Sequence, residues 1–374
     1  MKVALVCDWL TNVGGAEKVL LEIHKMFPDA PIYTSQYDPS KIDWFRDADV
    51  RTGSMQKYPA KLRKLLGPLR QRYFAKLDLS EYDLVISVTG AEAKAVKVPN
   101  GLHISYCHVP TQYYWHMYED YIKNPGFGIL NPLVRLCFRM AVRPLRRADR
   151  KAAKKVDYFV TISEYAKDLI KKYYERDAVV IHPPVEVDEF RTDVDREGTN
   201  SYFITTSRQV NWKRIDLAVK ACLMTQRKLV VIGEGPEHKK LVKLAKDSGL
   251  VKFLPVMKKE KLAKFITEAR GFLFPSLEPF GIAPVEALAA GCPVIAFGEG
   301  GALDYIVNGK NGLLFEKQDT KSLAAAILEF DKLKFNREKV SKTADKFSEK
   351  RFNTELSNFV KKCEKKNGKE KAKA

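Results

Sequence analysis

The chain has 374 residues, 45% of them hydrophobic, and a formal net charge of +19 at pH 7. This length exceeds the usual size of one hydrophobic core and favours two domains. The charge indicates an anionic partner: a nucleic acid, a phosphorylated small molecule or an acidic membrane surface. The six cysteines contain no C-x-x-C pair, so a disulfide or zinc framework is not expected and a reducing cytoplasm fits the chain.

The apolar runs argue against a membrane-spanning protein. No stretch approaches the ~20 apolar residues that a spanning helix requires. The first apolar run, in MKVALVCDWL, is short and meets Asp8. It therefore predicts a strand rather than a secretory signal peptide.

Short apolar runs alternate with helical patterns through the chain. Strands are expected at Val3–Cys7, Leu84–Val88, His103–Tyr106, Tyr158–Ile162, Val179–Ile181, Tyr202–Thr206, Leu229–Ile232, Lys252–Leu254, Phe272–Phe274, Val294–Phe297 and Leu313–Phe315. Helices are expected between them, for example at Glu17–Met26, Ile215–Leu223, Glu237–Asp247, Lys258–Arg270 and Ser322–Phe330. Because the strands lack polar alternation and are separated by helices, they predict parallel sheets covered on both faces. The fold class is therefore α/β and doubly wound.

A linker composition separates two halves of the chain. Residues 182–200, HPPVEVDEFRTDVDREGTN, contain paired prolines, many acids and a Gly-Thr-Asn ending. We expect an amino-terminal domain over residues 1–185, a second domain over residues 198–340, and a helix with a Lys-rich tail over residues 341–374. The last helical pattern runs over about Glu338–Lys362, and the tail is expected to be disordered. Ligands bind at the carboxyl ends of strands in such sheets, so two halves predict a cleft between facing strand ends.

Two glutamates follow the strand at Phe272–Phe274, in the segment LEPFGIAPVEALAAG. Gly281 permits a sharp turn and Pro284 suits the first helical position, which predicts Glu286 in the first helical turn. There Glu286 could simply complement the helix dipole. Alternatively, Glu278 and Glu286 face the cleft and accept hydrogen bonds from sugar hydroxyls, while backbone N–H groups at the helix start and in the later Gly-Gly turn hold a phosphate.

A basic pair follows the strand at Tyr202–Thr206, in the segment TTSRQVNWKRIDLAV. Arg208 and Lys213 lie five residues apart across a turn, so both could neutralise a nucleotide diphosphate and stabilise it as a leaving group. The alternative is a solvated basic turn. Further on, Gly233 in GEGPE could let the backbone approach a base or a ribose, or could serve only a strand-to-helix turn.

The amino-terminal half offers a glycine turn and an unusual aromatic loop. Gly14 and Gly15 precede a helix, where backbone N–H groups can bind an anion. A lone histidine is usually structural, but His108 lies just past a strand end in SYCHVPTQYYWHMY, at a position facing the expected cleft. The run at 113–115 suits either stacking on an acceptor sugar or packing in the core.

The segment EPFGIAPVEALAAGCPVIA resembles the E-x7-E signature of retaining family 4 glycosyltransferases. These enzymes have the GT-B fold of two Rossmann-like domains facing across a cleft, and the resemblance implies a carboxyl-terminal helix that crosses back to the first domain. It also implies that Glu278 lies beside the donor sugar and that Glu286 binds the nucleotide ribose. Arg208 and Lys213 match the family's ligands for the diphosphate.

A second resemblance covers the amino-terminal half. The CHVP segment is similar to the C-H-x-P segment of O-antigen mannosyltransferases, which implies that His108 contacts the donor sugar. In that sub-group an acid often follows the first glutamate, where this chain has Pro279, and an arginine stands where it has Gln112. Further donor contacts are expected from Gly14, Gly15, Gly233, Val256, Phe280, Gly281 and Ile282.

The resemblance implies a retaining hexosyltransferase of cell-surface polysaccharide or lipopolysaccharide synthesis, with GDP-mannose as the first donor and a glycan or lipid-linked sugar as acceptor. A UDP-hexose donor and a nucleotide-sugar epimerase are alternatives among enzymes. No cofactor and no divalent metal are expected, because the D-x-D pairs at Asp47–Asp49 and Asp193–Asp195 fall in polar loops. The alternative from another class is a basic nucleic-acid-binding protein. The chain lacks a recognisable reader motif, so nucleic acid is not an expected partner.

Two basic stretches lie in the first half. Residues 57–77 contain seven basic residues and no acid, and residues 135–155 contain nine basic residues and only Asp149 as an acid. Either could be a solvated helix face, but together they favour binding to an anionic membrane surface. We therefore expect a cytoplasmic protein, peripheral on the inner face of the cell membrane, that acts on a lipid-linked acceptor.

Overall fold

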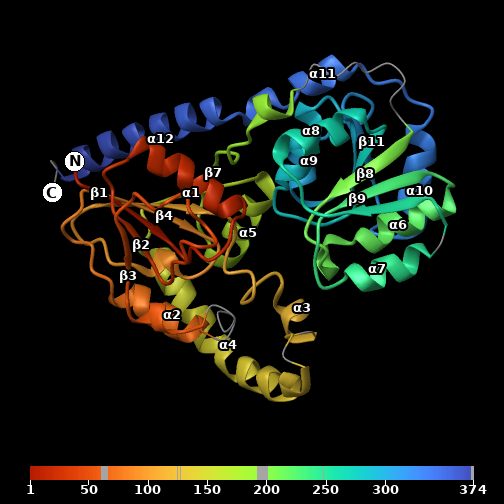
Figure 1. Cartoon of the computed structure of the whole chain (residues 1–374). Helices are drawn as coiled ribbons and strands as arrows, with labels where there is room; N and C mark the ends of the chain where they lie inside the picture. Colours follow the sequence, from red (N-terminus) through yellow and green to blue (C-terminus); the bar gives the residue numbers. More distant parts are fainter. Residues whose placement is uncertain (60–65, 124, 127, 192–200, 247, 372–374) are drawn as a thin grey trace. The chain divides into compact units, whose positions relative to one another are not determined.

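The computed structural model describes residues 1–59, 66–123, 125–126, 128–191, 201–246 and 248–371. The chain divides into two compact units (Figure 1). The first unit contains Met1–Pro183 and Phe352–Ala374, and the second contains Pro184–Arg351.

One parallel sheet forms the centre of the first unit. In the described residues its seven strands lie in the order β3-β2-β1-β4-β5-β6-β7. The bounds are β1 (Val3–Cys7), β2 (Ile32–Thr34), β3 (Val50–Thr52), β4 (Leu84–Thr89), β5 (Leu102–Cys107), β6 (Tyr158–Thr161) and β7 (Ala178–Val180). Strands β4 and β5 are buried along their whole length, as expected for a sheet with helices on both faces.

The helical elements of the first unit follow the strands along the chain. They include α1 (Gly15–Met26), α2 (Gly67–Lys76), α3 (Tyr118–Lys123), α4 (Asn131–Lys154) and α5 (Glu164–Tyr174), with the 3-10 turns η1 (Ser54–Lys57), η3 (Ala93–Ala95) and η4 (Gly128–Leu130). Helix α4 extends beyond the edge of this unit's sheet at its amino-terminal end (Figure 1). Its later turns supply buried apolar residues to the unit, among them Val142 and Leu145.

The second unit is built on a parallel sheet of its own. In the described residues the strand order is β10-β9-β8-β11-β12-β13. The strands are β8 (Tyr202–Thr206), β9 (Lys228–Ile232), β10 (Val251–Leu254), β11 (Gly271–Phe274), β12 (Val294–Phe297) and β13 (Gly312–Phe315). The helices include α6 (Ile215–Met224), α7 (His238–Ala245), α8 (Lys259–Glu268), α9 (Ile282–Ala289), α10 (Thr320–Phe330) and α11 (Arg337–Lys342), and the 3-10 turns are η5 (Val187–Phe190), η6 (Asn211–Lys213), η7 (Gly300–Asp304) and η8 (Asp345–Phe347).

The α/β, doubly wound fold class is confirmed: both units consist of a parallel sheet with helical connections. Each predicted strand is present with small shifts of its ends. Strands β2 and β3 were not predicted, because each has only three residues and neither belongs to a long apolar run. They pair in register, Ile32 opposite Val50, at one edge of the first sheet.

The prediction of one helix over Glu338–Lys362 is wrong. The chain forms α11, the turn η8, and then α12 (Glu349–Lys371). Ser348 lies between η8 and α12 in an extended conformation, with φ −63° and ψ 153°, so the two elements are not continuous. The prediction of a disordered tail is also wrong as far as Lys371, since α12 continues through it.

Helix α12 packs with the first unit from Phe352 onward. Its buried residues repeat at helical spacing, at Phe352, Leu356, Val360 and Cys363. The ring of Phe352 lies 5.8 Å from that of Tyr106 on β5. This apolar face explains why a Lys-rich sequence is helical here.

The described residues bear on the expectations about membranes and metals in two ways. None of the helices in the described part of the chain combines the length and apolarity needed to cross a bilayer. Within the same residues, no three His, Cys, Asp or Glu side chains gather where they could hold a metal ion.

Candidate functional site

Lys213 and Glu278 meet at the carboxyl edge of the second unit's sheet. Lys213 ends η6, which follows β8, and Glu278 follows β11, the neighbour of β8 in the sheet. The Lys213 ammonium lies 2.6 Å from Glu278 Oε1, and the side chains are 23% and 18% exposed. Ser276 Oγ donates a second hydrogen bond to the same carboxylate oxygen, at 2.7 Å. The structure thus brings together two residues predicted to serve the reaction.

A buried glutamine fixes the loop that carries Lys213. Gln209 is fully buried and its Nε2 donates to the Gly233 carbonyl at 2.6 Å. Its backbone N–H donates to the Glu234 carbonyl, and its Oε1 lies 2.8 Å from His238 Nδ1. The loops after β8 and β9 are therefore tied together. Sequence reasoning missed Gln209, because its partners Gly233, Glu234 and His238 lie at least 24 residues away in the sequence.

Gly233 is required for this loop pairing. Its φ is +130°, and a Cβ there would lie 2.1 Å from the Ser207 carbonyl oxygen. The close approach of the two loops accounts for the glycine without any ligand. This supports the turn interpretation and leaves the predicted donor contact of Gly233 open.

Arg208 contacts Trp212 rather than the Lys213–Glu278 pair. It is exposed, and its guanidinium lies 6.0 Å from the centre of the Trp212 ring, within cation–π range. Trp212 is itself 46% exposed. An exposed tryptophan beside two basic residues is a binding-surface feature that sequence reasoning did not single out.

The loop from Glu278 to Ile282 is held by the glycines of η7. The Gly301 N–H donates to the Glu278 carbonyl at 2.8 Å. A Cβ on Gly300 would lie 2.5 Å from that carbonyl oxygen, and one on Gly301 would lie 2.3 Å from Phe280 Cα. The Gly-Gly turn therefore positions the loop by direct packing.

Phe280 holds this loop in place through its buried side chain and its backbone carbonyl. Its side chain is 3% exposed and packs edge-on against Tyr305 and Phe347, and its carbonyl accepts a hydrogen bond from the Tyr305 hydroxyl at 2.8 Å. A donor contact from Phe280 could therefore involve only its backbone. Val256, by contrast, lies just past β10 with its side chain 71% exposed.

Helix α9 begins two residues earlier than predicted. Gly281, with φ +92°, precedes the first helical residue, Ile282. Pro284 is therefore the third helical residue, a position it can occupy because the first N–H groups of a helix have no intrahelical acceptor. Glu286 is half-buried and falls in the second turn, so the prediction of a first-turn position was wrong.

In the first unit, Gly14 and Gly15 form the start of α1 as predicted from the glycine turn. Gly14 is the capping residue, with extended backbone and no side-chain cap, and Gly15 is the first helical residue. A Cβ on Gly14 would lie 2.8 Å from Glu17 Oε2, and Glu17 is 7% exposed. The buried carboxylate thus occupies space beside the glycine turn.

Asp8 organises the neighbouring loop. It follows β1 and accepts hydrogen bonds from the Thr89 hydroxyl and from the N–H groups of Gly90, Ala91 and Ala93. Burial raises the pKa of its carboxyl, with the nearby charge of Glu92 adding to the effect. Sequence reasoning noted Asp8 only as the end of an apolar run.

His108 follows β5 and has an unsatisfied ring nitrogen. Its backbone N–H donates to the Thr89 carbonyl at 2.8 Å, and its ring lies 5.6 Å from that of Tyr106. Within the described residues its Nε2 has no hydrogen-bond partner although the atom is buried. Burial lowers the pKa of His108 to about 4, so the imidazole is neutral at pH 7. Such a group can make an uncharged hydrogen bond to a ligand.

The aromatic loop after His108 is part of the core. Tyr114 is fully buried and Trp115 is 8% exposed. Tyr113 and Tyr114 donate to Glu92 Oε1 at 2.5 and 2.9 Å, and the indole of Trp115 donates to Asp149 Oδ2 at 2.7 Å. These contacts favour the core interpretation over stacking on an acceptor sugar.

Two buried ion pairs complete this network. Arg70 Nε lies 2.7 Å from Glu92 Oε2, and Lys94 Nζ lies 2.6 Å from Asp149 Oδ1, with all four side chains at most 1% exposed. Burial works to lower the pKa of Arg70, but the charge and hydrogen bond of Glu92, together with Tyr113 and Asp8, outweigh burial and raise the pKa. Arg70 belongs to the basic stretch 57–77, so this stretch is not a simple solvated face. Its residues 60–65 lie outside the described residues.

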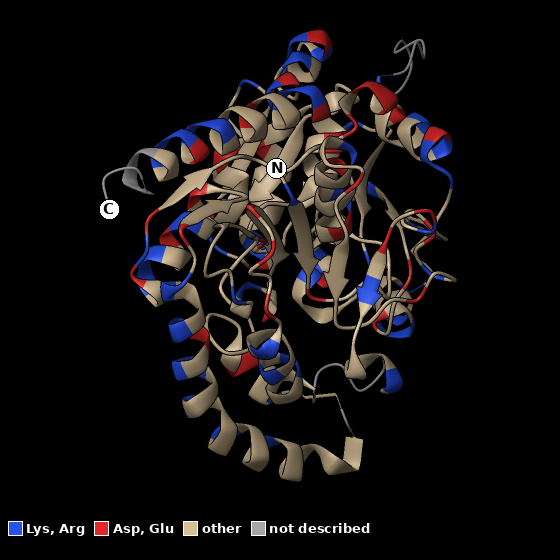
Figure 2. Ribbon diagram, turned by 90° about the vertical axis from the view of Figure 1, so that its left-hand side faces the viewer, with Lys and Arg blue, Asp and Glu red and all other residues tan. Residues whose placement is uncertain are grey.

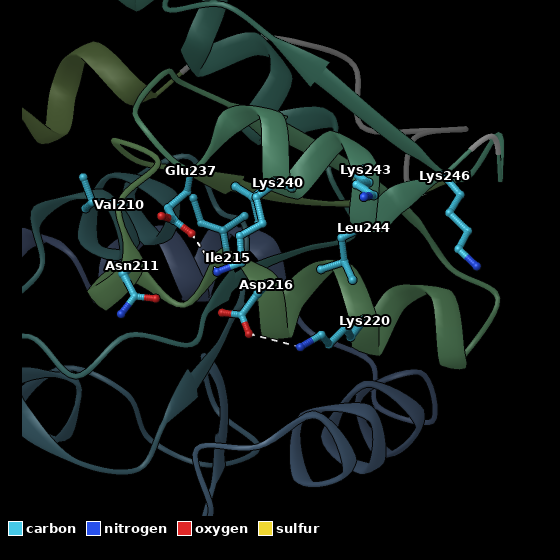
Figure 3. Close-up of a pocket in the computed structure, with 11 residues that line it drawn as sticks. Val210, Asn211, Ile215, Asp216, Lys220, Glu237, Lys240, Lys243, Leu244 and Lys246 are labelled. Carbon is cyan, nitrogen blue, oxygen red and sulfur yellow. Dashed lines mark hydrogen bonds and ion pairs between the residues drawn. The ribbon is translucent and has the colours of Figure 1, made fainter. Parts of the chain in front are cut away.

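A surface pocket of about 410 Å³ lies between α6 and α7 (Figure 3). It includes Lys220 and Lys240, which point toward Asp216 and Glu237 at 3.4 and 3.0 Å. None of the residues predicted for the site lines this pocket.

The second unit also contains the segment that matches a known protein family. Residues 186–347 match the family described as Glycosyl transferases group 1. The GDP-mannose-dependent alpha-(1-6)-phosphatidylinositol monomannoside mannosyltransferase of Mycolicibacterium smegmatis is 27% identical over 209 residues, covering 49% of this chain and 55% of that protein. The alpha-1,3/1,6-mannosyltransferase ALG2 of Mus musculus is 23% identical, covering 82% of each chain.

The chain spans about half the length of the first curated relatives it matches, 52% of an uncharacterized glycosyltransferase of Methanocaldococcus jannaschii and 55% of one of Bacillus subtilis. Among solved structures, Anabaena Alr3699/HepE in complex with UDP has a TM-score of 0.69 at 18% identity, covering 97% of this chain and 100% of that one. The apo lipopolysaccharide outer core galactosyltransferase WaaB has a TM-score of 0.70 at 16% identity, covering 96% and 99%. The predicted GT-B fold is therefore confirmed.

Proposed function

We propose that the chain is a retaining hexosyltransferase, because its residues 186–347 match the family described as Glycosyl transferases group 1. It moves a hexose from a nucleotide-sugar donor to a hydroxyl of a glycan or lipid-linked sugar. The observation that supports this most directly is the Lys213–Glu278 pair, a cation and a carboxylate held at the carboxyl edge of a parallel sheet. Ligands bind at this edge in open α/β sheets.

The pair suits a donor that carries both a diphosphate and sugar hydroxyls. When a diphosphate arrives, the Lys213 ammonium can exchange the Glu278 oxygen for a phosphate oxygen, and the carboxylate is then free to accept hydrogen bonds from the hexose. Arg208 is exposed on the same loop and adds a second cation. Both cations stabilise the negative charge that develops on the leaving diphosphate.

The reaction needs no protein nucleophile. The bond from the anomeric carbon to the phosphate oxygen breaks, and the acceptor oxygen forms its bond on the same face, so the configuration is retained. The proton of the acceptor hydroxyl passes to the departing phosphate oxygen. His108, neutral at pH 7, contributes a hydrogen bond to the donor sugar through Nε2.

GDP-mannose is the first donor we propose. The mannosyltransferase names of the relatives from Mycolicibacterium smegmatis and Mus musculus support mannose, and the first of these names GDP-mannose. A UDP-hexose is the second candidate, favoured by the likeness in fold to Alr3699/HepE in complex with UDP-glucose. Neither a cofactor nor a divalent metal takes part in the proposed reaction.

The acceptor is a lipid-linked sugar in cell-surface polysaccharide synthesis, reached by a protein peripheral on the inner face of the cell membrane. The phosphatidylinositol monomannoside in the name of the Mycolicibacterium relative is an acceptor of this kind. The net charge of +19 supports attraction to an anionic surface.

A panel of nucleotide sugars tests the proposal. We expect GDP-mannose to raise the melting temperature most and to be hydrolysed slowly without acceptor, with chelator present as well as absent. Failure of every nucleotide sugar to bind would contradict the proposal. Conversion of a donor to its epimer would favour the epimerase, and salt-sensitive DNA binding without turnover would favour the nucleic-acid-binding class.

A further inference from the structure

The amino-terminal end of α4 presents apolar side chains to solvent. Ile129 and Leu130, at the end of η4, are 95% and 56% exposed, and Leu133, Leu136 and Met140 on α4 are 59%, 56% and 64% exposed. We call these five residues the apolar tip. Scattered exposed apolar residues are ordinary, but a contiguous group on one projecting element marks an interaction site.

The tip is not required to hold α4 in place. Leu133, Leu136 and Met140 follow one another at spacings of three and four residues, so they share one face of the helix. A different face carries Phe138, whose ring lies 5.8 Å from that of Tyr118 and 6.4 Å from that of Tyr114. The helix therefore has one apolar face packed against its own unit and another left exposed.

Basic residues continue the exposed face toward the carboxyl end of α4. Arg143, Arg147 and Lys151 follow Met140 at spacings of three, four and four residues, and all three are exposed. The one acid of the helix, Asp149, is fully buried and paired with Lys94. The exposed charge of α4 is therefore entirely positive. In Figure 2 this helix lies at the bottom of the view, with blue patches along much of its length and tan at the lower end.

We propose that the apolar tip inserts into the surface of an anionic lipid bilayer, while Arg143, Arg147 and Lys151 contact the lipid phosphates. An amphipathic element of this kind lies in the interface with its apolar residues below the headgroups. Charge complementarity favours lipid over a second copy of this chain, because α4 packed on α4 would bring arginines of like charge together. The membrane contact is argued from the structure of α4. Its role, holding the enzyme at a lipid-linked acceptor, rests on the proposed function.

The chain carries a natural probe for this contact. Cys137 lies among the tip residues of α4 and is exposed, whereas the other five cysteines are buried. Burial also raises the pKa of the thiol of each of these five. A polarity-sensitive thiol dye should therefore label the full-length wild-type protein at Cys137.

The first experiment adds vesicles to the labelled protein. With about one-third phosphatidylglycerol in phosphatidylcholine, we expect the dye emission to shift to the blue and to be quenched by nitroxides placed in the acyl chains. Phosphatidylcholine alone should give at most a small shift. Unchanged emission while the protein floats with the vesicles would overturn the proposal, because another surface would then make the contact.

The second experiment compares matched variants. L133S/L136S/M140S should reduce partition to the anionic vesicles by at least about tenfold. The control M224S/V242S/L328S removes three apolar residues of similar exposure, 58%, 44% and 47%, from helices of the second unit and should partition within about twofold of wild type. Equal partition of the two variants would overturn the proposal.

Two further readouts separate the alternatives. A dimer that sediments in wild type and is lost in the tip variant would assign the apolar tip to a second copy, against the proposal. Hydrolysis of the nucleotide sugar should be unchanged in the tip variant. If no donor is hydrolysed by any form while the Cys137 dye still enters anionic vesicles, the proposed function fails and the membrane contact stands.

Discussion

The Lys213 ammonium lies 2.6 Å from the Glu278 carboxylate, and the two residues follow neighbouring strands of one parallel sheet. This places opposite charges where sequence reasoning expected a diphosphate ligand and a sugar ligand. The pair is partly exposed, so it contributes little to stability. Under the proposed function, the position of the pair matters more than its energy, because each partner would be exchanged for a polar group of the donor.

Removal of the cation should affect the reaction far more than the fold. Lys213→Ala should lower the rate of hexose transfer by about 10²–10³-fold, since a charge aimed at the leaving diphosphate is lost. Its unfolding free energy should change by less than about 1 kcal/mol. Initial rates and urea unfolding measure the two quantities.

Lys220→Ala is the matched control for this prediction. Lys220 forms an exposed pair with Asp216 at 3.4 Å, and it belongs to α6 rather than to the candidate site. Equal rate losses in the two variants would show that general surface charge, and not the position of Lys213, supports the reaction. Glu278→Gln keeps an acceptor for the Ser276 hydroxyl but removes the charge, and should also lower the rate.

Gly233 should be intolerant of a side chain. At φ +130° an added Cβ would lie 2.1 Å from the Ser207 carbonyl oxygen, so both the backbone and the loop packing would be strained. Gly233→Ala should lower the unfolding free energy by about 1–3 kcal/mol or more. Gly309→Ala is the control, because Gly309 has φ +73° with nothing within 4 Å of an added Cβ. If both variants lose a similar unfolding free energy, the effect comes from backbone conformation alone.

Glu92 should be essential to the stability of the first unit. It accepts hydrogen bonds from Arg70, Tyr113 and Tyr114 and is fully buried. Glu92→Ala should cost about 3–5 kcal/mol, because the Arg70 charge is left buried without its partner. Asp49→Ala removes the partner of Arg51 from an exposed pair and should cost about 1 kcal/mol or less. Chemical denaturation compares the two.

His108 should make the fold sensitive to mild acid. Burial lowers its pKa to about 4, whereas an unfolded histidine has a pKa of 6.5. Between these values the unfolded chain binds more protons, so stability falls as the pH falls from 6.5 to 4. His108→Gln should reduce the slope of unfolding free energy against pH by an amount that corresponds to at most one bound proton per molecule. An unchanged slope in unfolding experiments across this pH range would contradict the buried, neutral state of His108.

The carboxyl-terminal sheet shows what sequence patterns can predict. Strand β8 and strand β12 have the predicted bounds, because uninterrupted apolar runs between helices have few alternatives to a buried parallel strand. The same reasoning placed Lys213 and Glu278 after strands. It could not show that the two strands are neighbours, since the order of strands depends on packing between segments far apart in the sequence.

Other features depended on contacts that no local pattern contains. Asp8, Glu92 and Asp149 are buried acids whose hydrogen-bond partners lie between 21 and 85 residues away. The Tyr113–Trp115 run was ambiguous for the same reason, because an aromatic run packs in a core or on a ligand according to what surrounds it. The start of α9 was misplaced because Pro284 is allowed at more than one position of a first turn.

The return of α12 to the first unit also determines the order in which the protein can be completed. Phe352, Leu356 and Val360 fill the first unit's core, yet the ribosome adds them only after the entire second unit has been translated. The second unit, being continuous in the chain, can finish folding during synthesis. Until α12 emerges, the apolar surface that it covers in the first unit stays exposed. During translation this earlier-made unit is therefore the one that needs protection by chaperones.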